Sequence, residues 1–466
     1  MYLRLNEKPK DRIAVLEDTG EQYSYGELCD FVEEFGGWLP ERSLIFILCR
    51  NTMATMAGHV AAIENQIVPL MISCKMDVSL RNTLIETYQP EYLWIPRELQ
   101  KEFPYETIAE KYDYLLIRTG YDKAPLYPEL SMLLTTSGST GSPKLVRHSY
   151  KNLFANAENV ASFFGFTDRD RPLIDLQLHY TMGLNVACSS LFAGATLVMT
   201  TKTAMEREYW QVFKERHVTN ITGVPYNYEL LKKLRFFKMD LPDLRILAQG
   251  GGKLSDEMFR ELAEYAERTG KKFFATFGTT ETTARLAYLE PDKALEHIGS
   301  IGKAIPKGEL FLADEEGNVI QTAEADGELV YRGDNVTLGY AQKREDLSLG
   351  DERKGVYYTG DLAHRDSEGF YYIIGRKSRF LKLYGYRVGL DESERLIRDA
   401  FQVECACVGN DTQMEIYVTK ENKEQEIRRF ISDKTKIAIS AFEVIVVKEL
   451  PKNEVGKILY RELRRD

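Results

Sequence analysis

The fold of this chain is decided by the stretch Leu133-Leu134-Thr135-Thr136-Ser137-Gly138-Ser139-Thr140-Gly141-Ser142-Pro143-Lys144. An apolar run from Met132 to Leu134 predicts a strand, and it leads into a loop of hydroxyl residues and glycines that ends on a lysine. Glycines let the backbone approach an anion, and successive N–H groups form an anion-binding concavity. The stretch therefore predicts a loop that binds a polyphosphate.

The spacing of this loop excludes the commonest phosphate loop. From Gly138 the pattern is G-x-x-G-x-x-K, and Leu145 follows the lysine. A Walker loop requires G-x-x-x-x-G-K-[ST]. A flexible Ser/Gly linker is the alternative interpretation. The strand before the loop and the amphipathic segment Tyr150–Phe164 after it disfavour a linker.

A second string suited to nucleotide chemistry is Thr276-Phe277-Gly278-Thr279-Thr280-Glu281-Thr282-Thr283. An aromatic ring can stack on a base, a hydroxyl can bond a phosphate, and a carboxylate can hold magnesium, which prefers oxygen ligands. Taken alone, the string also fits an ordinary strand-to-helix turn. Its position at the end of a predicted strand favours a binding site, because ligands of open α/β sheets lie at the carboxyl ends of strands.

Three further strings follow in the last quarter of the chain. They are Tyr358-Thr359-Gly360-Asp361-Leu362, the basic run from Gly375-Arg376-Lys377-Ser378 to Gly385-Tyr386-Arg387-Val388, and Leu450-Pro451-Lys452-Asn453-Glu454-Val455-Gly456-Lys457-Ile458. Each is weak alone, since Gly-Asp turns are common and a basic run also fits a solvated strand edge.

Together and in this order, these strings resemble the motifs of the adenylate-forming (AMP-binding) superfamily. The family includes acyl-CoA synthetases, acyl-AMP ligases, the adenylation domains of peptide synthetases and firefly luciferase. The first loop resembles T-S-G-[ST]-T-G-x-P-K, with Leu145 in place of the usual glycine. The resemblance spans nearly the whole chain.

The resemblance implies ATP and Mg²⁺ as cofactors and assigns roles to individual residues. Lys457, His179 and Thr280 are the expected catalytic residues, Glu281 the magnesium ligand, Ser378 the hinge, and Tyr180 and Arg285 line the substrate pocket. The expected cofactor-binding residues are Thr136, Ser137, Gly138, Ser139, Thr140, Gly141, Lys144, Gly251, Gly252, Phe277, Gly278, Asp361, Arg376 and Gly385. Within this set Phe277 is expected to stack on adenine, Asp361 to bind ribose, and Gly385 to lie near a pantetheine tunnel.

The implied reaction activates a carboxylic acid with ATP to an acyl adenylate and releases pyrophosphate. A thiol, either coenzyme A or the phosphopantetheine of an acyl carrier protein acting in trans, then takes the acyl group. Transfer to a non-thiol acceptor and a non-catalytic AMP-binding homologue are the alternatives. Ser378 stands where the family usually has Asp or Lys.

The acid itself is less constrained by the sequence. Amino-acid-activating relatives carry an aspartate where this chain has Tyr180, and a buried ammonium without a carboxylate is costly. An α-amino acid is therefore disfavoured. Arg285 suggests contact with a second carboxylate or polar group, while bonding to the protein or to solvent is the alternative role of this arginine.

Composition sets further limits. The 466 residues carry a formal net charge of −10, which gives no support for binding nucleic acid or anionic membranes. The first residues are charged, no apolar run approaches a membrane span, and the six cysteines form no C-x-x-C pair. We therefore expect a reduced, cytoplasmic protein.

The predicted fold class is α/β. A large N-terminal domain, residues 1–377, is expected to contain two packed αβαβα subdomains and a small β-barrel-like subdomain, and a mobile α/β domain, residues 378–466, follows. The predicted helices include Ser255–Arg268 and a segment capped by Ser24 and Glu27 that ends at Phe35. The predicted strands are Leu44–Cys49, Val68–Ile72, Tyr92–Ile95, Tyr114–Ile117, Leu173–Leu176, Thr196–Met199, Asn220–Thr222, Leu244–Ala248, Lys272–Thr276, Leu310–Ala313 and Glu328–Tyr331.

Overall fold

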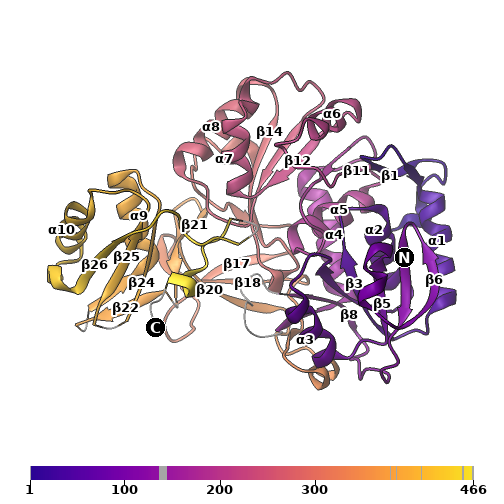
Figure 1. The fold of residues 1–466 in the computed structure, drawn as a ribbon. Helices are drawn as coiled ribbons and strands as arrows, with labels where there is room; N and C mark the ends of the chain where they lie inside the picture. The colour runs from indigo at the N-terminus through magenta and orange to yellow at the C-terminus, as the bar shows by residue number, and fades with distance from the viewer. Residues whose placement is uncertain are drawn as a thin grey trace.

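A computed structural model of the chain describes residues 2–135, 144–377, 379–384, 386–410, 412–453 and 456–463. Figure 1 shows a C-terminal unit, coloured gold, beside a larger body that contains the rest of the chain. The larger body is built on two sheets that share a pair of helices, and a smaller antiparallel sheet lies between it and the C-terminal unit.

The first large sheet has eight strands in the order β19-β9-β8-β4-β3-β5-β7-β6. Its strands are β3 (Leu44–Cys49), β4 (Val68–Ser73), β5 (Tyr92–Pro96), β6 (Glu106–Lys111), β7 (Tyr114–Arg118), β8 (Leu130–Thr135), β9 (Leu145–Ser149) and β19 (Gly339–Ala341). Strands β8, β4, β3 and β5 are parallel, and the outer pairs are antiparallel.

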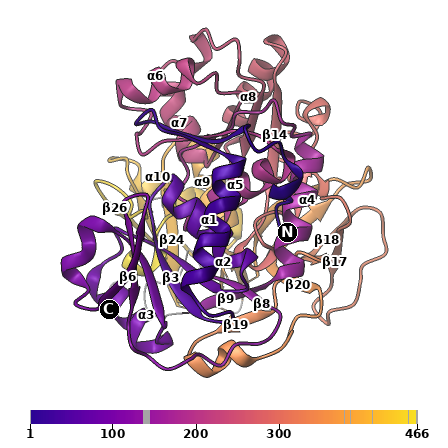
Figure 2. The same ribbon diagram turned by 90° about the vertical axis from the view of Figure 1, so that its right-hand side faces the viewer.

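Both faces of this sheet are covered, as the continuous apolar sequence of β3 requires. Ile45 and Ile47 join the core under α1 (Tyr25–Trp38) and α2 (Met53–Glu64), which Figure 2 shows side by side. Leu44 and Phe46 point to the other face, where α3 (Val78–Tyr88) packs. The predicted cap of α1 is confirmed, since Ser24 and Glu27 form a reciprocal capping box.

The second large sheet has the order β12-β13-β14-β15-β16. Its strands are β12 (Asn220–Gly223), β13 (Ile246–Gln249), β14 (Lys272–Phe277), β15 (Ala287–Leu289) and β16 (Lys303–Ala304). One face packs on α6 (Arg207–Glu215), α7 (Pro225–Lys233) and α8 (Asp256–Arg268). A neighbouring sheet, β10-β11-β1-β2, consists of β10 (Leu173–Ile174), β11 (Leu197–Met199), β1 (Ile13–Glu17) and β2 (Gln22–Ser24).

Helices α4 (Tyr150–Phe164) and α5 (Thr181–Ala193) form the layer shared by the two large sheets. Leu153 of α4 belongs to the core under the eight-stranded sheet, whereas Val160 and Phe164 pack on Phe274 of β14. The helix begins in a capping box made by Ser149 and Asn152. This shared layer confirms the predicted packing of two αβαβα subdomains.

The predicted β-rich subdomain is an antiparallel sheet of four strands, ordered β17-β18-β20-β21. The strands are β17 (Glu309–Ala313), β18 (Ala325–Arg332), β20 (Val356–Arg365) and β21 (Tyr371–Arg376). Within the described residues β17 and β21 are the two edges of this sheet, so it is open where a barrel-like subdomain was expected.

The chain beyond residue 378 has its own hydrophobic core. It contains β22 (Phe380–Leu383), β23 (Tyr386–Gly389), α9 (Leu390–Phe401), β24 (Cys405–Gly409), β25 (Met414–Val418), α10 (Glu424–Thr435) and β26 (Phe442–Val446). Cys405 and Cys407 are buried thiols of β24, and all six cysteines are free. Whether residues 1–377 and 378–466 move as two domains stays a prediction.

Most predicted strands are found within two residues of their expected ends. The exception is Glu328–Tyr331, since β18 already begins at Ala325. Of the predicted Leu173–Leu176, only Leu173–Ile174 pairs as β10. Asp175 follows this strand, is partly buried, and accepts a hydrogen bond from Tyr209 at 2.9 Å. Among the described helices, none has both the length and the apolar character that crossing a membrane would need.

Candidate active site

The predicted site residues lie where the strand ends of the two large sheets face the four-stranded sheet and the C-terminal unit. The loop residues Thr136, Ser137, Gly138, Ser139, Thr140 and Gly141 fall outside the described residues, as do Ser378 and Gly385. The lysine that closes the loop is described. Lys144 Nζ lies 3.4 Å from the centroid of the Tyr340 ring, so the loop ends against β19.

Glu281 is held at the centre of the site by the short helix η4 (Thr280–Thr282). The Tyr340 hydroxyl donates a hydrogen bond of 2.7 Å to Glu281 Oε1. The backbone carbonyl of Glu281 accepts a 3.0 Å hydrogen bond from Thr337 Oγ1. One carboxylate oxygen is thus oriented by the protein, which leaves the other oxygen for a cation.

The turn before Glu281 explains the glycine at 278. A Cβ at this position would lie 1.6 Å from the carbonyl oxygen of Ala284, so the turn closes only on glycine. Thr283 and Ala284 have φ values of 50° and 96°, and this unusual backbone brings residue 284 back onto the turn. Phe277 ends β14 and is partly buried beside the core of the four-stranded sheet.

Thr280 faces α5 across the site. Its Oγ1 is 2.9 Å from Thr181 Oγ1, and either hydroxyl can donate. Two hydroxyls held this close to each other and to Glu281 suit the oxygens of a phosphate, because each can turn its hydrogen toward an acceptor.

Asp361 lies on β20 with its side chain buried. Arg376 Nε of the neighbouring strand β21 lies 3.1 Å from Asp361 Oδ1. Burial is the main cause that raises the pKa of Asp361 to about 6, and Arg376 opposes this rise. A carboxylate held on a strand beside an arginine can accept the two hydroxyls of a ribose.

Lys457 is brought to the same place by the C-terminal unit. Its pKa is lowered by burial and then by Arg376, while Asp361 and Glu281 oppose the shift, so all three charges act on this lysine. The preceding Gly456 packs on α7, since a Cβ on it would lie 2.9 Å from Tyr226 Cβ. The structure therefore places Lys457, from the last predicted motif, near the charged residues of three earlier motifs.

An ion pair beside the predicted hinge accompanies this arrangement. Lys377 Nζ lies 2.7 Å from Glu328 Oε2 of β18, and the Glu328 side chain also accepts a 3.2 Å hydrogen bond from the Gly360 backbone N–H. The Lys377 backbone N–H donates to the Gly360 carbonyl at 2.7 Å. These contacts fix the chain just before residue 378 on the four-stranded sheet.

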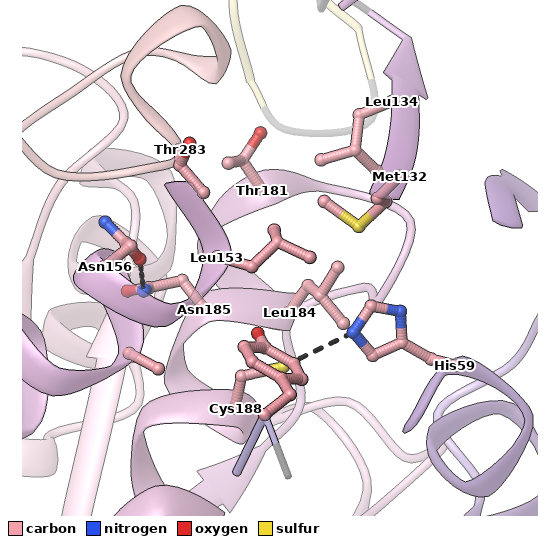
Figure 3. Close-up of a pocket in the computed structure, with 12 residues that line it drawn as sticks. His59, Met132, Leu134, Leu153, Asn156, Thr181, Leu184, Asn185, Cys188 and Thr283 are labelled. Carbon is pink, nitrogen blue, oxygen red and sulfur yellow. Dashed lines mark hydrogen bonds between the residues drawn. The ribbon is translucent and has the colours of Figure 1, made fainter. Parts of the chain in front are cut away.

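A narrow cavity enters the molecule beside Thr181 (Figure 3). It runs between α4, α5 and β8 and is lined by Met132, Leu134, Leu153, Leu184 and other residues of the shared layer. His179 and Tyr180 precede α5 at its start, with ring centroids 4.2 Å apart. Burial lowers the pKa of His179 to about 4, so the imidazole is neutral at pH 7.

Arg285 is buried to 2% exposure. Its Nε and Nη2 have no hydrogen-bond partner within the described ranges, and burial lowers its pKa to about 10. The Arg285 carbonyl accepts a 2.8 Å hydrogen bond from Asn335 Nδ2, which fixes the backbone here. Burying guanidinium nitrogens without hydrogen-bond partners destabilises the folded protein, so the burial of Arg285 requires an explanation.

Gly251 and Gly252 follow β13 on the α5 side of the site. Gly251 has a φ of 76°, and a Cβ on it would lie 3.1 Å from Val224 Cγ1. A Cβ on Gly252 would approach Pro225 to 3.2 Å. The backbone at both positions therefore lies close to the start of α7, and Gly251 also lies close to Met182 of α5.

Sequence reasoning missed the residues that hold the carboxylate of Glu281. Tyr340 bonds it across 59 positions, and Arg353 lies 4.4 Å from the Tyr340 ring centroid. No local spacing signals such contacts. Among the described residues no group of three His, Cys, Asp or Glu could hold a metal alone. Mg²⁺ is commonly bound by one or two carboxylates together with substrate phosphates, and the assignment of Glu281 as its ligand stays a prediction.

Comparison with known proteins gives consistent results. The family model described as AMP-binding enzyme matches residues 3–341. Indoleacetate–CoA ligase of Aromatoleum aromaticum is 28% identical over 76% of this chain and 71% of its own length. 2-Succinylbenzoate–CoA ligase of Geobacillus kaustophilus is 30% identical over 72% of this chain and 69% of its own length.

Solved structures agree on the fold. O-succinylbenzoate coenzyme A synthetase from Bacillus subtilis, in complex with AMP, superposes with a TM-score of 0.80 at 22% identity, covering 100% of this chain and 98% of that chain. ATP-bound MatB from Rhodopseudomonas palustris superposes with a TM-score of 0.79 at 20% identity, covering 99% and 97%. The predicted fold class is confirmed.

The bond between Tyr340 and Glu281 generates a first prediction. Tyr340→Phe removes the donor that orients the carboxylate, and loss of such a supporting bond lowers metal affinity by about tenfold. The Mg²⁺ concentration that gives half-maximal pyrophosphate release should rise by this factor. Tyr358→Phe is the control, because Tyr358 is 48% exposed. Unchanged Mg²⁺ dependence in Tyr340→Phe would contradict the role of this hydroxyl.

The raised pKa of Asp361 generates a second prediction. Below pH 6 the carboxyl is mostly protonated and loses its strength as an acceptor, so nucleotide affinity should fall about tenfold per pH unit. Titration of AMP binding between pH 5 and 8 measures this fall in affinity. Asp361→Asn should bind AMP weakly at all these pH values and should not show the fall. His364→Gln, which removes a surface ion pair with Asp326, should show the same fall as the wild type.

Proposed function

Because the chain belongs to the AMP-binding enzyme family, we propose that it is an AMP-forming acid–coenzyme A ligase whose acid carries a second anionic group. The observation that carries the proposal is the meeting of Lys457 with Asp361 and Glu281 around one space. Adenylate formation needs a lysine near the α-phosphate, a carboxylate that binds the ribose and a carboxylate that binds Mg²⁺. Lys457, Asp361 and Glu281 are our candidates for these three groups.

In the first half-reaction a carboxylate oxygen of the acid attacks the α-phosphorus of ATP. The new P–O bond gives the acyl adenylate, and the bond to the leaving pyrophosphate breaks. Lys457 stabilises negative charge at the α-phosphate, and Lys144 with the Thr136–Gly141 loop holds the departing phosphates. Bound Mg²⁺ would supply additional positive charge beside Glu281. Positioning and electrostatics contribute most of such catalysis.

The remaining roles are those that the family resemblance implies. Asp361 and Arg376 bind the ribose and phosphate, Phe277 stacks on adenine above Gly251 and Gly252, and Thr280 bonds the α-phosphate. Neutral His179, at the start of α5, contacts the acid near its carboxylate. The partly buried position of Phe277 and the neutrality of His179 support these assignments.

In the second half-reaction a thiol attacks the carbonyl carbon of the adenylate, the C–O bond to phosphate breaks, and AMP leaves. We assign coenzyme A as the thiol, since the related ligases carry it in their names. The C-terminal unit would turn about Ser378, moving Lys457 out and Gly385 toward the pantetheine. The Lys377–Glu328 ion pair would hold the chain on the near side of this pivot.

The substrate class rests on Arg285 and Tyr180. Arg285 is buried and remains charged at pH 7, and a second carboxylate would complete its hydrogen bonds. The relative from Geobacillus kaustophilus is named for 2-succinylbenzoate, a dicarboxylic acid. Tyr180 supplies no negative charge for an α-ammonium, which disfavours amino acids. A dicarboxylic acid fits both features.

The proposed reaction is tested with Mg²⁺-ATP and a panel of short, medium, aromatic, hydroxylated and dicarboxylic acids. Pyrophosphate release and hydroxylamine trapping report the adenylate, and AMP release with coenzyme A or a phosphopantetheinyl carrier protein reports the acceptor. Lys457→Ala should slow pyrophosphate release about a hundredfold. Lys452→Ala, on the same loop and paired with Glu404, is the matched control. Unchanged release in Lys457→Ala, or AMP release without any thiol, would contradict the proposal.

Arg285 gives a separate prediction. Arg285→Met keeps the volume and removes the charge, so turnover of dicarboxylic acids should fall at least tenfold relative to monocarboxylic acids of equal length. The thermal midpoint should not fall, because a buried charge without a partner is lost. The ratio of kcat/KM between the two acids measures the effect, and an unchanged ratio would show that Arg285 does not select the acid.

A further inference from the structure

The cavity beside Thr181 has a polar wall in an otherwise apolar layer. Leu153 and Leu184 line its middle, and Figure 3 shows them between His59 on one side and an asparagine pair on the other. Thr181 and Thr283 lie on the side of the reaction centre, since Thr181 contacts Thr280. The cavity therefore lies next to the proposed reaction centre, and its interior has room for a group about the size of one water molecule, such as a hydroxyl.

The asparagine pair consists of Asn156 of α4 and Asn185 of α5. The Asn185 side-chain NH₂ donates a hydrogen bond to Asn156 Oδ1. Asn156 Nδ2 and Asn185 Oδ1 have no hydrogen-bond partner in the described part of the chain. The two residues are 3% and 6% exposed, so bulk water does not satisfy these atoms.

The pair offers one donor and one acceptor at the same place. If both amides were turned over, the pair would still leave one carbonyl and one NH₂ without a partner. The group that matches it must accept a hydrogen bond and donate another. A hydroxyl does both, and so does a secondary amide, whereas an alkyl chain does neither.

Asn152, one turn earlier on α4, is a useful comparison because its side chain bonds only to groups of the protein. Its Nδ2 donates hydrogen bonds of 2.7 Å to the carbonyls of Asp334 and Val336, and its Oδ1 caps the helix through the Ser149 N–H. Every strong bond of Asn152 is made within the protein. Asn156 lies on the same buried face and lacks such bonds, so it is not explained by the packing of α4.

We propose that Asn156 and Asn185 select acids that carry a hydroxyl or amide group beyond the reacting carboxylate. The inference rests on the proposed function, because it names a second feature of the acid for the same site. An acid without the group would leave both amides unsatisfied in a dry cavity, and mismatches of this kind reduce binding by about 10- to 100-fold. An ordered water is the competing occupant, and it predicts no preference between acids.

The test compares matched acids with the wild-type enzyme and with the double variant Asn156→Leu, Asn185→Leu. The pairs are 4-hydroxyphenylacetate with phenylacetate, 6-hydroxyhexanoate with hexanoate, and 3-hydroxyglutarate with glutarate. Ratios of kcat/KM for pyrophosphate release and thermal stabilisation by each acid are measured. The wild type should favour the hydroxylated member of at least one pair by tenfold or more, and the double variant should lose this preference.

Two further readouts separate selection from a structural role. The double variant should keep or raise its thermal midpoint, because it removes two buried polar groups without partners. Asn152→Ala should lower the midpoint and leave the acid ratios unchanged. Equal ratios in the wild type and double variant, or no greater stabilisation of the wild type by any hydroxylated acid, would overturn the inference. Absence of pyrophosphate release with every acid would contradict the proposed function instead, since stabilisation is measured without turnover.

Discussion

Burial of α4 on two opposite faces is the constraint on which the rest of this structure depends. Leu153 is fixed in the core of the eight-stranded sheet, and Val160 and Phe164 are fixed against Phe274 of the second sheet. A rigid helix that packs on both sheets determines the distance between them. Lys144 and the turn that carries Glu281 consequently lie near each other, since Tyr340 contacts both side chains.

The buried polar groups of this site reduce the stability of the folded protein. Asp361, Arg285 and the asparagine pair of the shared layer are nearly removed from water, and a well-packed apolar core would be more stable in their place. Asp361 is partly compensated by Arg376. Arg285 and Asn156 have polar atoms without a described partner, and under the two proposals above the bound acid would supply the missing interactions. In sites that recognise polar substrates, such groups lower the folding stability of the free enzyme.

Much of the fold could be predicted because its signals are local. The apolar string of β3 predicted a strand that is covered on both faces, and Ser24 with Glu27 predicted the start of α1. The motif residues Asp361 and Glu281 lie near enough to Lys457 to act on its charge, while their roles stay predictions. The contacts of Tyr340 with Glu281 and of Asn156 with Asn185 could not be predicted, since they join distant segments and depend on side-chain direction. The open edge of the four-stranded sheet also depends on long-range pairing.

The pKa of Lys457 connects the position of the C-terminal unit to its chemistry. Burial and Arg376 disfavour the charged lysine, while Asp361 and Glu281 favour it, and the first two effects are larger. The charged lysine is therefore stabilised less by these protein groups than it would be beside a triphosphate. Added negative charge from ATP would reverse this balance and stabilise the docked unit. Under the proposed mechanism, loss of pyrophosphate would remove part of that attraction and ease the release of the lysine. The electrostatics of this one side chain would then couple the proposed chemical step to the proposed domain movement.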